Sequence, residues 1–392
     1  VIDLGEQAYT GFFPKNKEDL IPSGSLSLGL SKESGLLQMI STFDPSIMYG
    51  SNYGYRSGLN KTMVKHLCDT SDYLTKIKPL VKGDVCLDIG SNDATFLKSI
   101  KESGIIKVGI DPNIEKFQDY YPPEIYKSSA FFSSSEFFKL SIKKASIITS
   151  IAMFYDLDDP VEFARQVNEC LTDDGIWFFE QSYMPLMLDS LSFDTICHEH
   201  YEYYSLSTIK YILDKAGLYI ADVIFNDMNG GSFGIIARKE SKPISKKTSA
   251  TINWVLEKER RLKLNTPSPY IEFSDRVAVF REELVSLINN LKNSGAMICG
   301  IGASTKGNVL LQYCNLSSNE INCIGDVNED KFGCYTPGSL IPIVSEFFVL
   351  ESKPDYLLIL PWHFKDHFIE RFKDFRLQGG KLIFPLPRIQ IL

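Results

Sequence analysis

The chain has 392 residues, more than one hydrophobic core usually organises, so two or three domains are expected. With 44% apolar and 23% charged residues and a formal net charge of −8, it has the composition of a globular protein and no basic stripe for nucleic acid. No apolar run approaches the roughly 18 residues of a membrane span, and the first residues do not form a secretory signal. We therefore expect a cytoplasmic protein that binds neither nucleic acid nor a membrane.

The chain falls into four predicted stretches. Residues 1–75 are turn-rich and predict a small irregular N-terminal domain. Residues 76–240 alternate apolar runs with helical spacing, which is typical of a parallel sheet covered by helices on both faces. A linker rich in Lys, Ser, Thr and Pro is expected over 241–272, and a second Rossmann-like α/β domain over 273–392. Strands are expected at 85–89, 107–110, 146–151, 175–180, 296–300, 321–326, 356–360 and 381–385, and helices up to 99 and at 161–171, 252–262 and 273–293.

A glycine turn with two acids follows the first strand of the 76–240 block. The run 88–93 reads Asp-Ile-Gly-Ser-Asn-Asp, and the next strand ends in Asp111. Ligands of doubly wound sheets bind beyond the carboxyl ends of the strands. The missing side chain at Gly90 lets the backbone approach a ligand, and an acid at the second strand end can accept both ribose hydroxyls.

The composition of this turn indicates which adenosine-containing ligand it binds. A dinucleotide site needs Gly-x-Gly-x-x-Gly for its pyrophosphate, but this turn has one glycine and an added acid. Acids repel a pyrophosphate and suit an ammonium and a sulfonium group, so the turn predicts S-adenosylmethionine. A plain strand-turn-helix with a chance acid is the alternative. The predicted cofactor residues are Asp88, Ile89, Gly90, Ser91, Asn92, Asp93, Asp111, Pro112, Ser150 and Ile151.

Two histidines flank an acid in the run His198-Glu-His200. Histidine titrates near neutrality and is the usual general base. In an extended segment His198 and His200 would share one face with Glu199 opposite, whereas in a helix they would lie roughly 200° apart. A catalytic base, a metal ligand and a structural histidine all stay open at this point, and a metal would need a distant third ligand such as His363 or His367.

The chain resembles the sugar C-methyltransferases that build branched-chain deoxysugars from nucleotide-diphospho-4-keto sugars, over nearly its whole length. The most specific matches are Phe-Asp-Thr-Ile-Cys-His-Glu-His at 193–200 and Gly-Ile-Gly-Ala-Ser-Thr-Lys-Gly-Asn at 300–308, in this order. The other matching segments are 4–7, 53–57, 88–93, 109–112, 229–232, 335–338, 341–343 and 354–356.

The resemblance implies a fold and a reaction. It implies a class I methyltransferase doubly wound α/β sheet, preceded by the small N-terminal domain and followed by the Rossmann-like domain, which binds the substrate. It also implies an S-adenosylmethionine-dependent enzyme, monomeric or homodimeric, that methylates a carbon of a nucleotide sugar. A sugar O-methyltransferase on the same scaffold, a NAD-dependent epimerase or dehydrogenase, and a non-catalytic binding module are the alternatives.

In the implied mechanism a base removes the proton next to a 4-keto group, and the enolate attacks the sulfonium methyl, so no metal is needed. His200 is the expected base, oriented by Glu199, with His198 as the alternative. Tyr53, Tyr55 or Tyr183 could donate a phenol to the enolate oxygen. The turn at 300–308 could cradle a diphosphate with backbone amides while Lys306 adds charge, or its domain could merely pack and dimerise. The predicted substrate residues are Tyr55, Arg56, Tyr183, Gly302, Ala303, Ser304 and Lys306.

Three departures from the family pattern stand out. Where relatives carry the second of two zinc-binding cysteine pairs, this chain has Ser31 and Ser34, and the first pair would lie at or before residue 1. None of the eight cysteines forms a Cys-x-x-Cys pair, and serine oxygens are poor zinc ligands, so no zinc is expected. Cys197 and Asp156 stand where better-known members have a tyrosine and a histidine.

Overall fold

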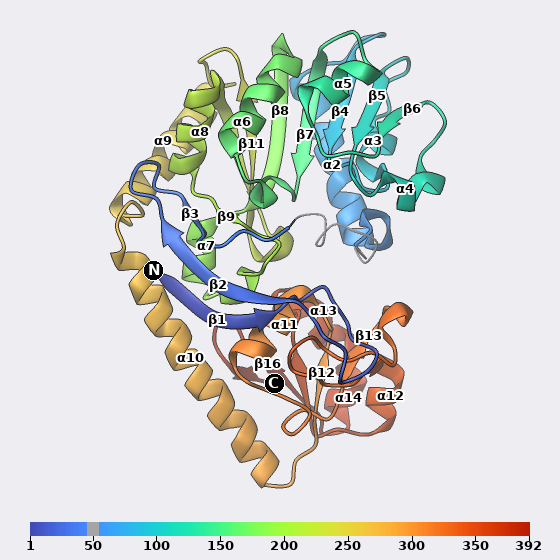
Figure 1. Cartoon of the computed structure of the whole chain (residues 1–392), viewed down its shortest axis with the longest axis vertical. Helices are drawn as coiled ribbons and strands as arrows, with labels where there is room; N and C mark the ends of the chain where they lie inside the picture. Colours follow the sequence, from blue (N-terminus) through green and yellow to red (C-terminus); the bar gives the residue numbers. More distant parts are fainter. Residues whose placement is uncertain (45–54) are drawn as a thin grey trace. The chain divides into compact units, whose positions relative to one another are not determined.

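The computed structural model describes residues 1–44 and 55–392 (Figure 1). The chain divides into two compact units. The C-terminal unit contains Val1–Phe43, Met184–Tyr201 and Lys263–Leu392, and the central unit contains Asp44–Tyr183 and Glu202–Leu262. The segment with the paired histidines therefore packs with the second α/β sheet, although it lies within 76–240 in the sequence. The domain boundaries drawn along the chain stay predictions.

The central unit is built on a seven-stranded sheet of order β10-β11-β8-β7-β4-β5-β6. Only β11 is antiparallel to its neighbours, and the other strands run parallel to one another. The order reverses beside β4, where ligands of such sheets bind. This topology confirms the expected class I methyltransferase sheet. Its strands are β4 (Val85–Ile89), β5 (Ile106–Ile110), β6 (Ile125–Ser128), β7 (Ala145–Ile151), β8 (Leu171–Ser182), β10 (Tyr219–Asn226) and β11 (Ser232–Arg238), and the unit also holds the short β9 (Glu202–Tyr203).

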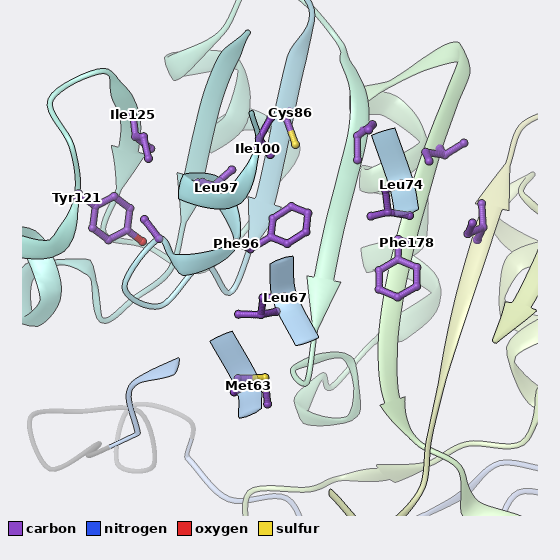
Figure 2. Packing of buried hydrophobic residues seen from close by; sticks show 14 of the residues in the cluster. Met63, Leu67, Leu74, Cys86, Phe96, Leu97, Ile100, Tyr121, Ile125 and Phe178 are labelled. Carbon is purple, nitrogen blue, oxygen red and sulfur yellow. The ribbon is translucent and has the colours of Figure 1, made fainter. Parts of the chain in front are cut away.

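Helices cover both faces of this sheet because its strands alternate large apolar side chains. Phe178 of β8 packs toward Leu67 and Phe96, as Figure 2 shows, whereas its neighbour Trp177 contacts Phe163 on the opposite face. The helices of the unit are α2 (Lys61–Ile77), α3 (Thr95–Ser99), α4 (Ile114–Phe117), α5 (Ser134–Leu140), α6 (Pro160–Cys170), α8 (Leu206–Ala216) and α9 (Lys246–Arg261).

Helix α2 lies in a stretch that the sequence analysis treats as irregular. The side chain of Asn60 caps it by accepting the amide of Thr62 at 2.9 Å. Met63, Leu67 and Leu74 form its buried face, at the three- and four-residue spacing of a helix. The helix therefore supplies part of the core beside β4 (Figure 2).

The C-terminal unit contains a six-stranded sheet of order β14-β13-β12-β15-β16-β17, parallel except for β17. This confirms the expected second Rossmann-like domain. Its strands are β12 (Ile298–Ile301), β13 (Ile324–Asp326), β14 (Ile343–Ser345), β15 (Tyr356–Ile359), β16 (Lys381–Phe384) and β17 (Gln390–Ile391). Its helices are α7 (Met184–Asp189), α10 (Ser268–Asn293), α11 (Thr305–Tyr313), α12 (Glu346–Glu351), α13 (Lys365–Arg371) and α14 (Lys373–Leu377).

The long helix α10 is amphipathic rather than uniformly apolar. Its buried residues follow helical spacing, from Tyr270 through Phe273 and Val277 to Ile288. Across the ranges 1–44 and 55–392, none of the helices is long and apolar enough to cross a membrane. Within the expected linker, helix α9 fills 246–261 and α10 begins at residue 268.

The N-terminal residues form an antiparallel ribbon of β1 (Ile2–Ala8), β2 (Ser23–Leu30) and β3 (Leu37–Met39). Where relatives would hold zinc, the Ser31 hydroxyl accepts the amide of Ser34 at 3.3 Å, and Gly35 turns the chain at a φ of 72°. No group of three or more His, Cys, Asp or Glu suited to a metal is found among the residues that the structure describes. The Ser31 hydrogen bond and the positive φ of Gly35 together shape the β2–β3 turn.

Glu259 of α9 should matter for the stability of the central unit. Its side chain is buried and accepts hydrogen bonds from the Tyr183 hydroxyl at 2.7 Å and from the amides of Leu206 and Ser207 at 2.7 and 2.8 Å. We expect Glu259→Ala to lower the free energy of unfolding by about 2–4 kcal/mol in urea denaturation, because the two buried donors of Tyr183 and Leu206 and the part-buried amide of Ser207 lose their acceptor. The matched control is Glu257→Ala on the exposed side of the same helix, where little change is expected. Equal effects of the two variants would contradict this role of Glu259.

Candidate active site

A cavity of about 450 Å³ opens at the carboxyl edge of the central sheet, beside the ends of β4, β5 and β7. This cavity, the central pocket, lies wholly within the central unit. Eight of the ten predicted cofactor residues line it: Asp88, Ile89, Gly90, Ser91, Asn92, Asp111, Pro112 and Ile151. Asp156, which was predicted only as a departure from the family, lines it too, and the lining residues without a sequence prediction are Asp44, Met63, Leu67, Thr95, Phe96, Asn113, Phe131, Phe132, Ala152, Met153, Leu157 and Asp158.

Asp88 ends strand β4 as a buried carboxyl group. Its Oδ1 accepts the hydroxyl of Thr149 from the neighbouring β7 at 2.6 Å. Burial raises the pKa of Asp88 to about 7, against the opposing effect of the Thr149 hydrogen bond and with a smaller contribution from the charge of Asp111. Because a nearby positive charge favours the ionised carboxylate, a cation bound in the pocket would lower this pKa and release the proton of Asp88.

Asp111, at the end of β5, holds the glycine turn in shape. Its two oxygens accept the amides of Asn92 at 2.9 Å and Asn113 at 2.6 Å. Burial raises its pKa, and these two amide hydrogen bonds lower it. Gly90 has a φ of 73°, and a Cβ atom there would lie 3.1 Å from Cγ of Met153, so the turn needs glycine.

The remaining two predicted cofactor residues lie behind the pocket wall. Asp93 accepts the amide of Gly58 at 3.0 Å and the hydroxyl of Thr95. The hydroxyl of Ser150 is buried and accepts the indole N–H of Trp177 at 3.2 Å. Both side chains therefore brace the pocket from outside its lining.

The predicted substrate residues of this unit are spread over different places. Tyr55 lines the central pocket, where its carbonyl accepts the side-chain amide of Asn92 at 3.2 Å. The guanidinium of Arg56 lies 4.1 Å from the ring centroid of Tyr120. Tyr183 is buried, bonded to Glu259, and outside the pocket lining. Tyr53 lies outside the described residues.

The paired histidines sit in a turn that is neither extended nor helical, because the amide of His200 donates to the carbonyl of Cys197 at 3.1 Å. His198 is 1% exposed, and its Nε2 donates to the carbonyl of Gly24 at 3.1 Å. Its ring packs between Tyr9 and Phe43, with centroids 4.6 and 4.9 Å away. His198 therefore has the surroundings of a structural histidine.

His200 has a fixed tautomer. Its Nδ1 must donate to the carbonyl of Thr195, 2.8 Å away, so Nε2 carries the lone pair in the neutral ring. Burial, and then the charge of Lys306, lower the pKa of His200 to about 4. The imidazole is thus neutral at pH 7 and able to accept a proton at Nε2.

Glu199 does not orient His200 in the way that the sequence suggested. Of the described residues, none forms a hydrogen bond with its carboxyl group, and the carbonyl of Thr195 takes the orienting position. Burial raises the pKa of Glu199 to about 7. Glu199 and His200 are therefore consecutive groups with very different affinities for a proton.

One buried and two half-buried polar groups lie beside His200 within the C-terminal unit, where helix α11 packs against the short helix η4 (Phe193–Thr195). Asp194 is fully buried, and its Oδ2 accepts the indole N–H of Trp362 at 2.7 Å. Lys306 lies in the first turn of α11, and its charge acts on Asp194, His200 and His363. We name Asp194, His200, Lys306 and His363 the polar cluster. Sequence reasoning mentioned His363 only as a possible metal ligand, although it follows the carboxyl end of β15.

The glycine turn at 302–306 has used most of its amides. The amide of Gly302 donates to the carbonyl of Gly325 at 2.7 Å, and that of Ala303 donates to Oδ2 of Asp326 at 2.8 Å. The Ser304 hydroxyl accepts the amide of Gly307 at 3.1 Å. A diphosphate cradle made of backbone amides would have to displace these hydrogen bonds.

Comparisons with known families match both α/β blocks. A methyltransferase domain model matches residues 60–223, and a C-methyltransferase C-terminal domain model matches residues 227–387. C-methyltransferase NovU of Streptomyces niveus is 28% identical over 377 residues, which is 96% of this chain and 88% of NovU.

Solved structures overlap with only part of the chain. The complex of the Haloferax volcanii Trm112 methyltransferase activator with a methyltransferase is 14% identical, covers 46% of this chain and 94% of that chain, and has a TM-score of 0.38. The mitomycin 7-O-methyltransferase MmcR is 12% identical, covers 46% of this chain and 55% of its own, and has a TM-score of 0.36. The two domain matches and the NovU match show an S-adenosylmethionine-dependent methyltransferase that is similar to C-methyltransferases over both α/β blocks.

Proposed function

We propose that this enzyme methylates a carbon next to the keto group of a nucleotide-linked deoxysugar, and that His200 removes the proton from that carbon. The observation that carries the proposal is the tautomer of His200, whose Nδ1–H is held by the carbonyl of Thr195 so that Nε2 can act as a base. The substrate class comes from the resemblance of segments 193–200 and 300–308 to enzymes acting on 4-keto sugars.

The central pocket suits S-adenosylmethionine. Asp111 lies at the end of the second strand, where ribose hydroxyls are accepted, and the acid Asp88 favours a cationic ligand. Gly90 keeps the turn open, because a Cβ there would lie within 3.1 Å of Met153. Bound S-adenosylmethionine supplies an electrophilic methyl group, so the remaining task of the chain is to make the substrate carbon nucleophilic.

Of the two histidines, His200 is better placed for this task. His198 is locked between two aromatic rings and donates its Nε2–H to Gly24. Glu199 is not needed to orient the base, so we assign it a separate role as the acceptor of the proton that His200 removes, since its pKa of about 7 lies above that of His200. The roles of Tyr55, Arg56, Tyr183 and the 302–304 turn stay predictions, as do the cytoplasmic location and the monomeric or dimeric state.

Loss of the Asp111 carboxyl group should weaken cofactor binding. We expect Asp111→Ala to raise the Kd of S-adenosylhomocysteine about 100-fold or more in isothermal titration, because charge-assisted hydrogen bonds to the ribose are lost. Asp119→Ala removes an exposed acid from the same unit and should leave the Kd unchanged. Unchanged affinity of a folded Asp111→Ala protein would remove Asp111 from the site.

Cofactor binding should also release protons near neutral pH. Because Asp88 has a pKa of about 7, it is half protonated at pH 7, and the ligand's ammonium group favours the ionised form. Titrations in two buffers of different ionisation enthalpy should therefore show release of about half a proton per S-adenosylhomocysteine bound. The release should fade above pH 8 and disappear in Asp88→Asn. Proton uptake in the wild type would contradict this assignment.

Replacing His200 should abolish catalysis without affecting the cofactor. We expect His200→Gln to lower kcat by about 10²–10⁴, with the Kd of S-adenosylhomocysteine unchanged, because the proton acceptor is lost. His367→Gln is the matched control, since His367 is an exposed histidine of the same unit. Full activity of His200→Gln would remove the proposed base.

Mass spectrometry and NMR of the product decide the reaction: a branched carbon supports the proposal, and a methoxy group assigns a sugar O-methyltransferase instead.

A further inference from the structure

The polar cluster lies where two strands of the C-terminal sheet end. Lys306 follows β12 in the first turn of α11, and His363 follows the neighbouring β15. The segment 193–200 adds Asp194, which Trp362 binds through a 2.7 Å hydrogen bond, and His200. Ligands of parallel sheets bind beyond this edge, so the position is that of a substrate site.

Only two members of the polar cluster, Lys306 and Asp194, can carry a charge at pH 7. Within the described parts of the chain, Lys306 is the one cation whose charge shifts the pKa values of Asp194, His200 and His363. Burial and Lys306 lower the pKa of both imidazoles, to about 4 and about 3, so both rings are neutral at pH 7. Burial raises the pKa of Asp194 and lowers that of Lys306, and each charge favours the other, so the pair carries no net charge whether both groups are ionised or both are neutral.

The absence of net charge on the pair of Lys306 and Asp194 argues against a diphosphate at Lys306. A diphosphate carries more than one negative charge, and burying it beside a lysine already offset by Asp194 would leave that charge uncompensated. The turn offers few amides to help, because those of Gly302, Ala303 and Gly307 are already bonded. A neutral ketone fits better, because it becomes negative only as its proton is removed.

We propose that Lys306 donates a hydrogen bond to the substrate's keto oxygen and stabilises the enolate that forms when His200 removes the adjacent proton. The inference rests on the proposed function and names the group that stabilises its intermediate. The C–H bond next to the ketone breaks, and its proton moves to Nε2 of His200. The electron pair forms a carbon–carbon double bond while the carbonyl π electrons move onto the oxygen, which faces the Lys306 ammonium.

The weakness of the base explains why such a donor is needed. An imidazole whose pKa is held near 4 abstracts a proton from carbon only if the product anion is strongly stabilised. The same ammonium that lowers the basicity of His200 in the free enzyme stabilises the enolate, and the enolate in turn favours protonated His200. Asp194 is the positioning residue: it is fully buried and fixed by Trp362, and its charge opposes the loss of the Lys306 proton.

The test separates proton removal from substrate binding. The enzyme is incubated in D2O with S-adenosylhomocysteine and a nucleoside-diphosphate 4-keto-6-deoxyhexose, and NMR follows deuterium entry next to the ketone. We expect Lys306→Met to slow this exchange about 10²–10³-fold, as for loss of an oxyanion donor. The Kd of the free nucleoside diphosphate should not change. Lys306→Arg should exchange faster than Lys306→Met, because it keeps a cation.

Controls keep the outcomes distinct. Lys373→Met, which removes an exposed lysine of the same unit, should exchange like the wild type. If Lys306→Met does not fold, Lys306→Ala supplemented with ethylammonium should recover exchange in proportion to the amine. If Lys306→Met exchanges deuterium at the wild-type rate, the role of Lys306 is overturned but the proposed function is not. The same holds if Lys306→Met loses affinity for the nucleoside diphosphate while the bound substrate still exchanges. Absence of both exchange and methylation in the wild type overturns the proposed function itself.

Discussion

Each sheet depends on one hydrogen bond between a carboxylate and the first glycine turn. In the central unit, Asp111 at the end of β5 accepts the amide of Asn92 at 2.9 Å. In the C-terminal unit, Asp326 at the end of β13 accepts the amide of Ala303 at 2.8 Å. A buried carboxylate is costly without such donors, and a turn with positive φ is held only if its amides are satisfied. The same interaction therefore shapes both carboxyl edges.

The carboxyl edges of the two sheets differ in the charged groups that lie beside Asp111 and Asp326. Beside Asp111 lies a second acid, Asp88, whose burial raises its pKa, so the edge attracts a cationic ligand. Beside Asp326 lies Lys331, with its Nζ 3.5 Å from the carboxylate, so the acid is already paired. One fold thus gives a cofactor edge in the central unit and, in the C-terminal unit, an edge that carries the polar cluster of Asp194, His200, Lys306 and His363.

Local patterns in the sequence predict those parts of the fold that local forces decide. Strand Val85–Ile89 and the acid at Asp111 follow from an apolar run and a strand end, and both are present as expected. The conformation around His198 could not be predicted, because a histidine with two aromatic neighbours from distant segments has no local signature. Helix α2 did have one, the Asn60 cap and the spacing of its buried residues, but the turn-rich residues before it masked this signal.

The N-terminal ribbon also holds helix α11 of the C-terminal unit in position. The backbone of Ala8 donates to and accepts from the side-chain amide of Gln312, at 2.8 and 3.1 Å, and the carbonyl of Thr10 accepts the side-chain amide of Asn308 at 3.0 Å. Both side chains belong to the helix that carries Lys306. These contacts come from the backbone of Ala8 and Thr10, at and just after the end of β1. They therefore hold the first turns of α11, and with them Lys306, against the N-terminal ribbon.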